Sequence, residues 1–230
     1  MLTQTQGQIY LANQRGCTQS NWYRSFHTFN CKSYFKESRK PFNNLLSLND
    51  ITLKAEHCIK QEATENIAVC LIPLVGNLKF KQPNEAYKLL EVGESVVFSV
   101  NKGDLYEVEC PYKRSLINYL QIEIKVSETI NYNQSQFDFN SQMNQLLSLL
   151  KTDNHCFNIS IGKFNGRVEG EHLVKNPENG LFAFVIEGAF EVQDRLLQIR
   201  DGLALWEVEQ INFEALSNDA IILILDVGKV

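Results

Sequence analysis

The feature of this sequence that most constrains its fold is a succession of short apolar runs rich in Val, Ile, Leu and Phe, with almost no long helical periodicity. Clusters of Gly, Asn, Asp and Pro separate the runs, and such clusters are typical of turns. The clearest runs cover residues 67–74, 95–100, 119–126, 182–186, 204–206, 210–213 and 220–227. Many short strands at close spacing predict an all-β sandwich or barrel.

One pattern of glycines occurs twice in the chain. In each half an apolar strand closes on a glycine, and a second glycine follows 17 residues later in the first half and 14 residues later in the second. The two pairs are Gly76 with Gly93 and Gly188 with Gly202. Glycine supplies the positive φ that sharp bends at a barrel rim need. The pattern is typical of a cupin barrel, and its repetition predicts two such barrels in the 230 residues.

A segment rich in Asn, Gln and Ser, residues 131–154, separates the two halves. Within it, Phe139, Met143, Leu146, Leu147 and Leu150 would line one face of a helix, so periodicity favours a short helix here. A strand that enters the second barrel is the competing interpretation.

Several stretches resemble a known family. Residues 22–29 read Trp-Tyr-Arg-Ser-Phe-His-Thr-Phe, and Ser-Tyr-Phe follows at 33–35. This start is similar to the N-terminal signature of the pirins and the pirin-like quercetin dioxygenases. Residues 179–188, 200–206 and 220–227 are similar to the strands of that family's second cupin barrel. The resemblance extends over residues 9–227, which is nearly the whole chain.

The resemblance implies an all-β bicupin, in which two double-stranded β-helix barrels of the jelly-roll type share one chain. It places the N-terminal cupin domain at 1–130, an inter-barrel segment at 131–154 and the C-terminal cupin domain at 155–230. In the family's layout the run 145–150 is the first strand of the second barrel rather than a helix.

The resemblance also implies a mononuclear iron-type site in the N-terminal barrel, held by three His and one Glu from a His-x-His and a His-x-Glu strand. The corresponding positions here are Lys60, Glu62, Tyr106 and Val108. An ammonium group repels a metal cation, valine has no donor atom, and tyrosine ligates only as phenolate, from a reference pKa of about 10. Only Glu62 is a plausible ligand. We expect that the metal site is lost and that a salt bridge from Lys60 to Glu62, with Tyr106 hydrogen-bonded nearby, replaces it.

The remaining histidines do not provide a second site. His27 is expected to be a hydrogen-bonded structural group, and His57 is a single ligand on a strand whose neighbouring residues face the other way. His155 and His172 each lie near a turn without a second histidine beside them. The sequence also contains no G-x-S-x-G, no Gly-rich phosphate loop, no H-E-x-x-H and no C-x-x-C motif.

Composition narrows the choice of partners and compartment. The net charge of −5 argues against a nucleic-acid partner, and no apolar run approaches the ~18 residues of a membrane span. The six scattered cysteines and the absence of a secretory signal predict a cytoplasmic protein with reduced thiols. We therefore expect a metal-free, non-catalytic pirin-like bicupin without a cofactor, which binds a small ligand or a protein partner. The alternative is a metal-dependent quercetin-type dioxygenase with a non-standard site.

Overall fold

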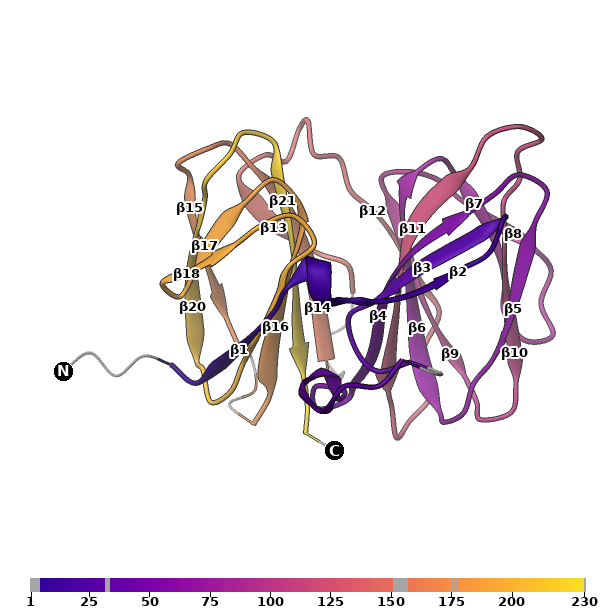
Figure 1. Cartoon of the computed structure of the whole chain (residues 1–230), viewed down its shortest axis with the longest axis horizontal. Helices are drawn as coiled ribbons and strands as arrows, with labels where there is room; N and C mark the ends of the chain where they lie inside the picture. The colour runs from indigo at the N-terminus through magenta and orange to yellow at the C-terminus, as the bar shows by residue number, and fades with distance from the viewer. Residues whose placement is uncertain (1–4, 32–33, 151–156, 175, 177, 230) are drawn as a thin grey trace. The chain divides into compact units, whose positions relative to one another are not determined.

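The structure, a computed structural model, describes residues 5–31, 34–150, 157–174, 176 and 178–229. Its elements are 21 strands and two short 3-10 helices, η1 (Ala12–Gln14) and η2 (Glu37–Arg39), so the predicted all-β fold is confirmed (Figure 1). Among the described residues, no helix has both the length and the apolar character that crossing a membrane would require.

The chain divides into two compact units, each built from two sheets. The first barrel comprises Gly16–Pro41 and Leu45–Gln136, and the second comprises Met1–Arg15, Phe42–Asn44 and Phe137–Val230. These units are not contiguous in sequence, unlike the predicted domains 1–130 and 155–230. The difference arises because the N-terminal strand β1 (Gly7–Tyr10) pairs with β19 (Gly202–Leu205), near the other end of the chain.

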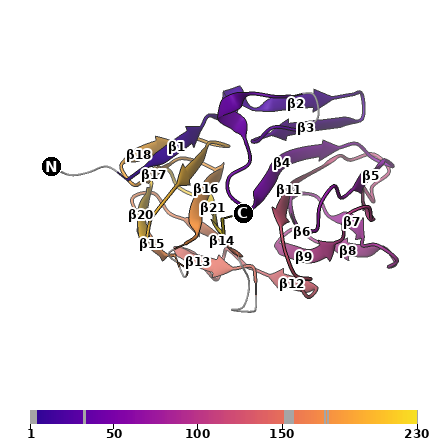
Figure 2. The ribbon, with the colours of Figure 1, turned by 90° about the horizontal axis from the view of Figure 1, so that it is seen from below.

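The first barrel has a seven-stranded sheet facing a four-stranded sheet, and Figure 2 shows how the two walls enclose the barrel. The order in the larger sheet is β12-β9-β6-β11-β4-β3-β2, and the order in the smaller is β5-β10-β7-β8. The strands are β2 (Gly16–Gln19), β3 (Tyr23–His27), β4 (Leu45–Leu53), β5 (Cys58–Glu62), β6 (Ile67–Val75), β7 (Leu78–Lys81), β8 (Lys88–Leu90), β9 (Glu94–Val100), β10 (Leu105–Glu109), β11 (Ile117–Lys125) and β12 (Asn133–Gln136).

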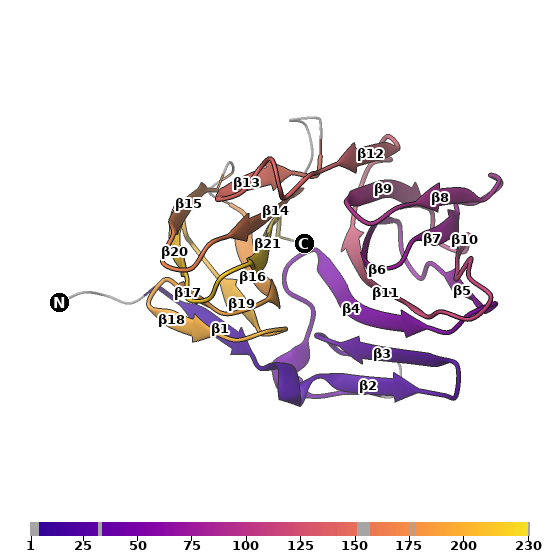
Figure 3. The same cartoon turned by 90° about the horizontal axis from the view of Figure 1, so that it is seen from above.

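The second barrel repeats the arrangement with sheets of six and four strands, which lie opposite each other in Figure 3. The larger sheet has the order β1-β19-β16-β21-β14-β13 and the smaller has β15-β20-β17-β18. Its further strands are β13 (Gln145–Ser148), β14 (Phe157–Phe164), β15 (Glu169–Leu173), β16 (Gly180–Glu187), β17 (Phe190–Val192), β18 (Arg195–Leu197), β20 (Gln210–Ala215) and β21 (Ala220–Val227). Each barrel surrounds its own apolar core.

The run at 145–150 contains a strand rather than a helix. Gln145–Ser148 forms β13 and pairs antiparallel with β14, from Gln145 opposite Lys163 to Ser148 opposite Ser160. The helical interpretation is therefore wrong. Pairing with an adjacent strand decides the conformation of so short a run, because local periodicity over a few residues is weak compared with a complete hydrogen-bond ladder.

The predicted glycine bends are found at three of the four positions. Gly76, Gly93 and Gly188 adopt positive φ, whereas Gly202 is the first residue of β19. In the turn before β19 it is Arg200 that takes a positive φ, of 66°. Gly202 serves close packing instead: a Cβ there would lie 2.6 Å from Cζ of Phe182, too near for any side chain without movement of that ring.

Candidate functional site

The four predicted metal positions lie on two neighbouring strands of the first barrel, β5 and β10. The register places Tyr106 opposite Gln61 and Val108 opposite Ile59. Directly opposed residues of an antiparallel pair project to the same face. Tyr106 and Val108 are buried in the core of the barrel, so Gln61 and Ile59 share the inward face with them.

Lys60 and Glu62 have the opposite orientation and are exposed on the outer face of β5. The predicted salt bridge between them is wrong, because Lys60 Nζ pairs with Glu107 Oε1 at 3.4 Å across the strand pair. The hydroxyl of Tyr87 donates to Glu107 at 2.6 Å, and this bond, helped by Lys60, lowers the pKa of the Glu107 carboxyl. Lys60 and Glu62 therefore point away from the barrel interior, and Ile59 and Gln61 are the inward residues of β5.

A hydrogen-bonded cluster of polar side chains occupies the inward positions, where a salt bridge between Lys60 and Glu62 was expected. Gln61 Nε2 donates to Gln121 Oε1 at 2.8 Å, and Gln121 Nε2 donates back to Gln61 Oε1 at 2.9 Å. The Tyr106 hydroxyl donates to Glu123 Oε1 at 2.6 Å and also lies 2.9 Å from Gln61 Oε1. Ser47 completes the cluster by donating to Glu123 Oε2 at 2.9 Å. We call these five residues the tyrosine–glutamine network.

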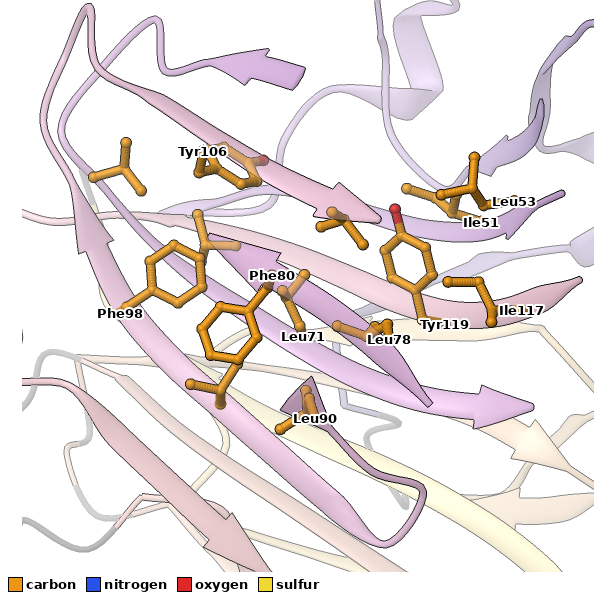
Figure 4. Packing of buried hydrophobic residues seen from close by; sticks show 14 of the residues in the cluster. Ile51, Leu53, Leu71, Leu78, Phe80, Leu90, Phe98, Tyr106, Ile117 and Tyr119 are labelled. Carbon is orange, nitrogen blue, oxygen red and sulfur yellow. The ribbon is translucent and has the colours of Figure 1, made fainter. Parts of the chain in front are cut away.

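Four strands, β4, β5, β10 and β11, position the network because alternate residues of each point into the barrel. Gln121 and Glu123 lie two residues apart on β11, and Ser47 of β4 is directly opposite Glu123. Tyr106 is 1% exposed, and its ring packs edge-on against Phe98 with the ring centroids 6.0 Å apart. The network is thus anchored on the apolar core, as the close view of that cluster shows for Tyr106 (Figure 4).

Burial and the neighbouring Glu123 raise the pKa of Tyr106 well above its ordinary value. Removing a proton would create a second negative charge beside Glu123 in a poorly solvated place, and both effects favour the neutral phenol. Tyr106 therefore acts as a hydrogen-bond donor at neutral pH. It is not available as a phenolate ligand.

The inward residues do not fit the metal centre that the family resemblance implies. Val108 and Ile59 carry no donor atom, Tyr106 holds its proton, and the amide of Gln61 is hydrogen-bonded to Gln121. Within the described ranges, no cluster of three or more His, Cys, Asp or Glu side chains is arranged to hold a metal ion. Iron, nickel and zinc centres are built mainly from imidazole, thiolate and carboxylate ligands, and this face offers only Glu123.

The structure places three of the four histidines. His27 is buried between Thr18, at 2.9 Å, and Asn49, at 2.8 Å, which confirms its predicted structural role. His57 stacks on Trp22 with the ring centroids 5.0 Å apart, and its Nδ1 lies 2.7 Å from the carbonyl oxygen of Ala55. His155 lies outside the described residues.

His172 has a partner that sequence reasoning missed. Its Nε2 lies 2.9 Å from Oδ1 of Asp226, a carboxyl group that is almost completely buried in the second barrel. The two residues are 54 positions apart, on β15 and β21, so no local motif links them.

The network residues were also missed, although the sequence carries a signal for one of them. In Cys58–Glu62 the charged residues Lys60 and Glu62 alternate with Ile59 and Gln61, and charges normally face solvent. That alternation alone predicts Gln61 as an inward residue. Gln121 and Glu123 alternate similarly with apolar residues on β11, but there the apolar residues are also buried. The side of β11 that lines the barrel is therefore not evident from its sequence.

Two barrels in one chain, each built from two antiparallel sheets, define the class of protein as a bicupin. Residues 154–227 match the family described as the quercetinase C-terminal cupin domain. The chain is 23% identical over 235 residues to quercetin 2,3-dioxygenase from Escherichia coli O157:H7, covering 96% of this chain and 100% of that protein. It is 21% identical to the putative quercetin 2,3-dioxygenase PM1685 of Pasteurella multocida, covering 94% and 97% respectively.

The same fold occurs in solved structures. The E. coli protein YhhW aligns over 98% of this chain and 99% of its own, with a TM-score of 0.85 and 20% identity. The nickel(II) complex of this bacterial pirin aligns with a TM-score of 0.84 over 98% and 100%. These comparisons agree with the predicted resemblance of the chain to the pirin-like bicupins.

Proposed function

We propose that this pirin-like bicupin is metal-free and acts by binding a small ligand or a protein partner rather than by oxygenation. The observation that carries the proposal is the tyrosine–glutamine network, which occupies the inward positions of β5, β10 and β11 with mutually satisfied hydrogen bonds. A metal-dependent oxygenase needs several lone pairs aimed at one point, and it needs open coordination positions for its substrates.

Converting the network into a metal site would carry a large energetic cost. Glu123 would have to give up the hydrogen bond from Tyr106, and Gln61 would have to break its reciprocal amide pair with Gln121. Each buried polar group left without a partner costs about 1–3 kcal/mol. The network is therefore a stable alternative to a metal centre, and it also holds the barrel walls together.

The competing candidate is a metal-dependent dioxygenase acting on a flavonol such as quercetin. It is favoured by the relatives named quercetin 2,3-dioxygenase, which this chain matches over most of its length. That candidate requires a ligand set other than the three His and one Glu expected for the family.

Oxygen uptake separates the two candidates. The purified full-length chain is incubated with quercetin and, in separate samples, Fe(II), Ni(II), Mn(II) or Cu(II), with the E. coli protein YhhW measured in parallel. The proposal predicts that oxygen uptake equals that of quercetin and metal without the protein. Catalytic turnover with any of these metals would overturn the proposal and establish the dioxygenase.

We further propose that the protein works in a reducing compartment such as the cytoplasm. In support, Cys58, Cys70 and Cys110 carry free thiols, and burial raises the pKa of Cys70 to about 12. Nucleic acid and membranes are not expected as partners, in keeping with the acidic composition. Fractionation of cells that produce the protein from its own gene would contradict this compartment if the chain appeared outside the cytoplasm.

A further inference from the structure

A hollow of about 390 Å³ lies at one end of the first barrel, away from the tyrosine–glutamine network. Its walls come from the turn between β2 and β3, the end of β4 and the loop that leads into β11. The side chains that give it its chemical character are Arg24, Lys54, Arg114, Trp22, Tyr23 and Thr52. Small-molecule sites commonly have volumes of about 300–1,000 Å³, so the hollow is large enough for a ligand.

The charge of the hollow is opposite to that of the chain. The protein has a net charge of −5, whereas the lining contains three cations and no carboxyl group. Within the described part of the chain, none of Arg24, Lys54 and Arg114 forms a salt bridge. Three cations gathered without a counter-charge repel one another, and a bound anion would relieve that repulsion.

The backbone fixes two of these cations beside each other, Arg24 on β3 and Lys54 directly after the end of β4. Arg24 of β3 is directly opposite Thr52 of β4, and the amide of Lys54 donates to the carbonyl oxygen of Trp22 at 2.9 Å. The guanidinium of Arg24 lies over the ring of Phe26, 5.3 Å from its centroid. This contact restricts the long Arg24 side chain before any ligand arrives, so less conformational entropy is lost on binding.

Aromatic rings form the other part of the lining. Trp22 is held in place by its stacking on His57, with an interplanar angle of 15°, and it contacts Tyr23 at a centroid distance of 5.8 Å. Both residues are partly exposed and pack against the apolar core. A rigid indole next to guanidinium groups suits a ligand that joins a planar ring to a negative charge.

The hollow is separate from the positions of the lost metal centre. The core residues Leu53 and Ile117 lie at the opposite end of the apolar cluster from Tyr106 (Figure 4). Leu116, which lines the hollow directly before β11, and Glu123 of the network on β11 are seven residues apart, which is about 23 Å along an extended strand. A ligand in the hollow would therefore not touch the network.

We propose that this hollow binds a phosphate monoester of an aromatic or heterocyclic alcohol, with the phosphate held by Arg24, Lys54 and Arg114 and the ring packed against Trp22. Guanidinium groups form paired hydrogen bonds with phosphate oxygens, and three cations match a group that carries close to two negative charges at neutral pH. The inference rests on the proposed function, because both assign the protein a ligand-binding role. It does not depend on whether the first barrel holds a metal.

Fluorine NMR of the full-length chain labelled with 5-fluorotryptophan tests the inference, because Trp22 and Trp206 are its only tryptophans and lie in different barrels. The probes are phenyl phosphate, adenosine monophosphate, inorganic phosphate and phenol, and Trp206→Phe assigns the two resonances. We expect the two esters to shift the Trp22 resonance saturably and to leave Trp206 unchanged. Binding should weaken as salt is added, since the attraction is electrostatic.

Arginine variants locate the phosphate. Arg24→Gln and Arg114→Gln should each weaken binding of phenyl phosphate about tenfold or more, because each removes charged hydrogen bonds. Arg167→Gln, an exposed arginine of the second barrel, is the matched control and should bind as the wild type does.

An unshifted Trp22 resonance with both esters at low salt would overturn the inference, as would wild-type affinity in both Arg24→Gln and Arg114→Gln. Equal affinity for inorganic phosphate and phenyl phosphate would overturn the role given to the ring. Failure here is distinguishable from failure of the proposed function, because the latter would appear as quercetin-dependent oxygen uptake.

Discussion

Two buried tyrosines of the first barrel give a paired test of the hydrogen-bond network. Tyr106 and Tyr119 are 1% and 0% exposed and belong to the same apolar core. The Tyr106 hydroxyl donates to Glu123 at 2.6 Å, whereas the Tyr119 hydroxyl is buried without a hydrogen-bond partner among the described residues. Substitution by phenylalanine removes one oxygen from each and leaves the ring in place.

Only one of the two substitutions should lower stability. Tyr106→Phe deprives Glu123 and Gln61 of a neighbour, and we expect a loss of about 1–2 kcal/mol, since Glu123 keeps Ser47 and is only partly buried. For a chain of this length that corresponds to a fall in Tm of roughly 2–8 °C. Tyr119→Phe removes a hydroxyl that is desolvated without compensation, so stability should stay the same or rise by up to about 1 kcal/mol.

Guanidinium unfolding followed through the fluorine resonance of labelled Trp22 measures the stability of the first barrel specifically, because Trp206 belongs to the second. The reasoning predicts a lower midpoint for Tyr106→Phe than for Tyr119→Phe. Equal destabilisation by both substitutions, or a stable Tyr106→Phe, would show that the network does not hold the barrel together.

Three further predictions concern pH and the second barrel. The pKa of Tyr106 is raised in the folded state, so the stabilisation that the neutral phenol provides is complete below the unfolded pKa of about 10 and is lost as pH rises further. The free energy of unfolding should therefore fall more steeply with pH above about 10 in the wild type than in Tyr106→Phe. Gly202→Ala should cost about 1–3 kcal/mol in thermal unfolding, because the new Cβ would lie 2.6 Å from Phe182, and a neutral result would refute the close packing. His172→Leu should lower the stability of the second barrel by about 1–3 kcal/mol, measured through Trp206, because Asp226 loses its partner; unchanged stability would mean that water replaces the imidazole.

Much of the fold could be predicted from the sequence because the local signals and the tertiary structure agree. The apolar runs became strands, and Gly76, Gly93 and Gly188 adopt the positive φ expected of them. The pairing of Gly7–Tyr10 with β19 could not be predicted, because it joins residues almost two hundred positions apart and leaves no local pattern. The same limit explains the missed contact between His172 and Asp226.

The candidate site could be predicted only in part, because the resemblance does not fix which residues of a strand point into the barrel. Tyr106 and Val108 lie inside the barrel, as the family resemblance implies, but Lys60 and Glu62 lie outside it. The loop before β5 contains Glu56 at a φ of 61°, and such a turn can change which residue of the next strand points inward. The family resemblance does not reveal this change, whereas the alternation of charged and uncharged residues in β5 does.

The metal content of the purified protein tests the central claim most directly. The chain is produced in medium supplemented with iron, nickel, manganese and zinc, purified without chelators, and analysed by inductively coupled plasma mass spectrometry beside the bacterial pirin YhhW. The network of Tyr106, Gln61, Gln121 and Glu123 predicts metal far below one ion per chain. Near-stoichiometric iron, nickel, manganese or zinc in this chain would contradict the claim that hydrogen bonds have replaced the metal centre.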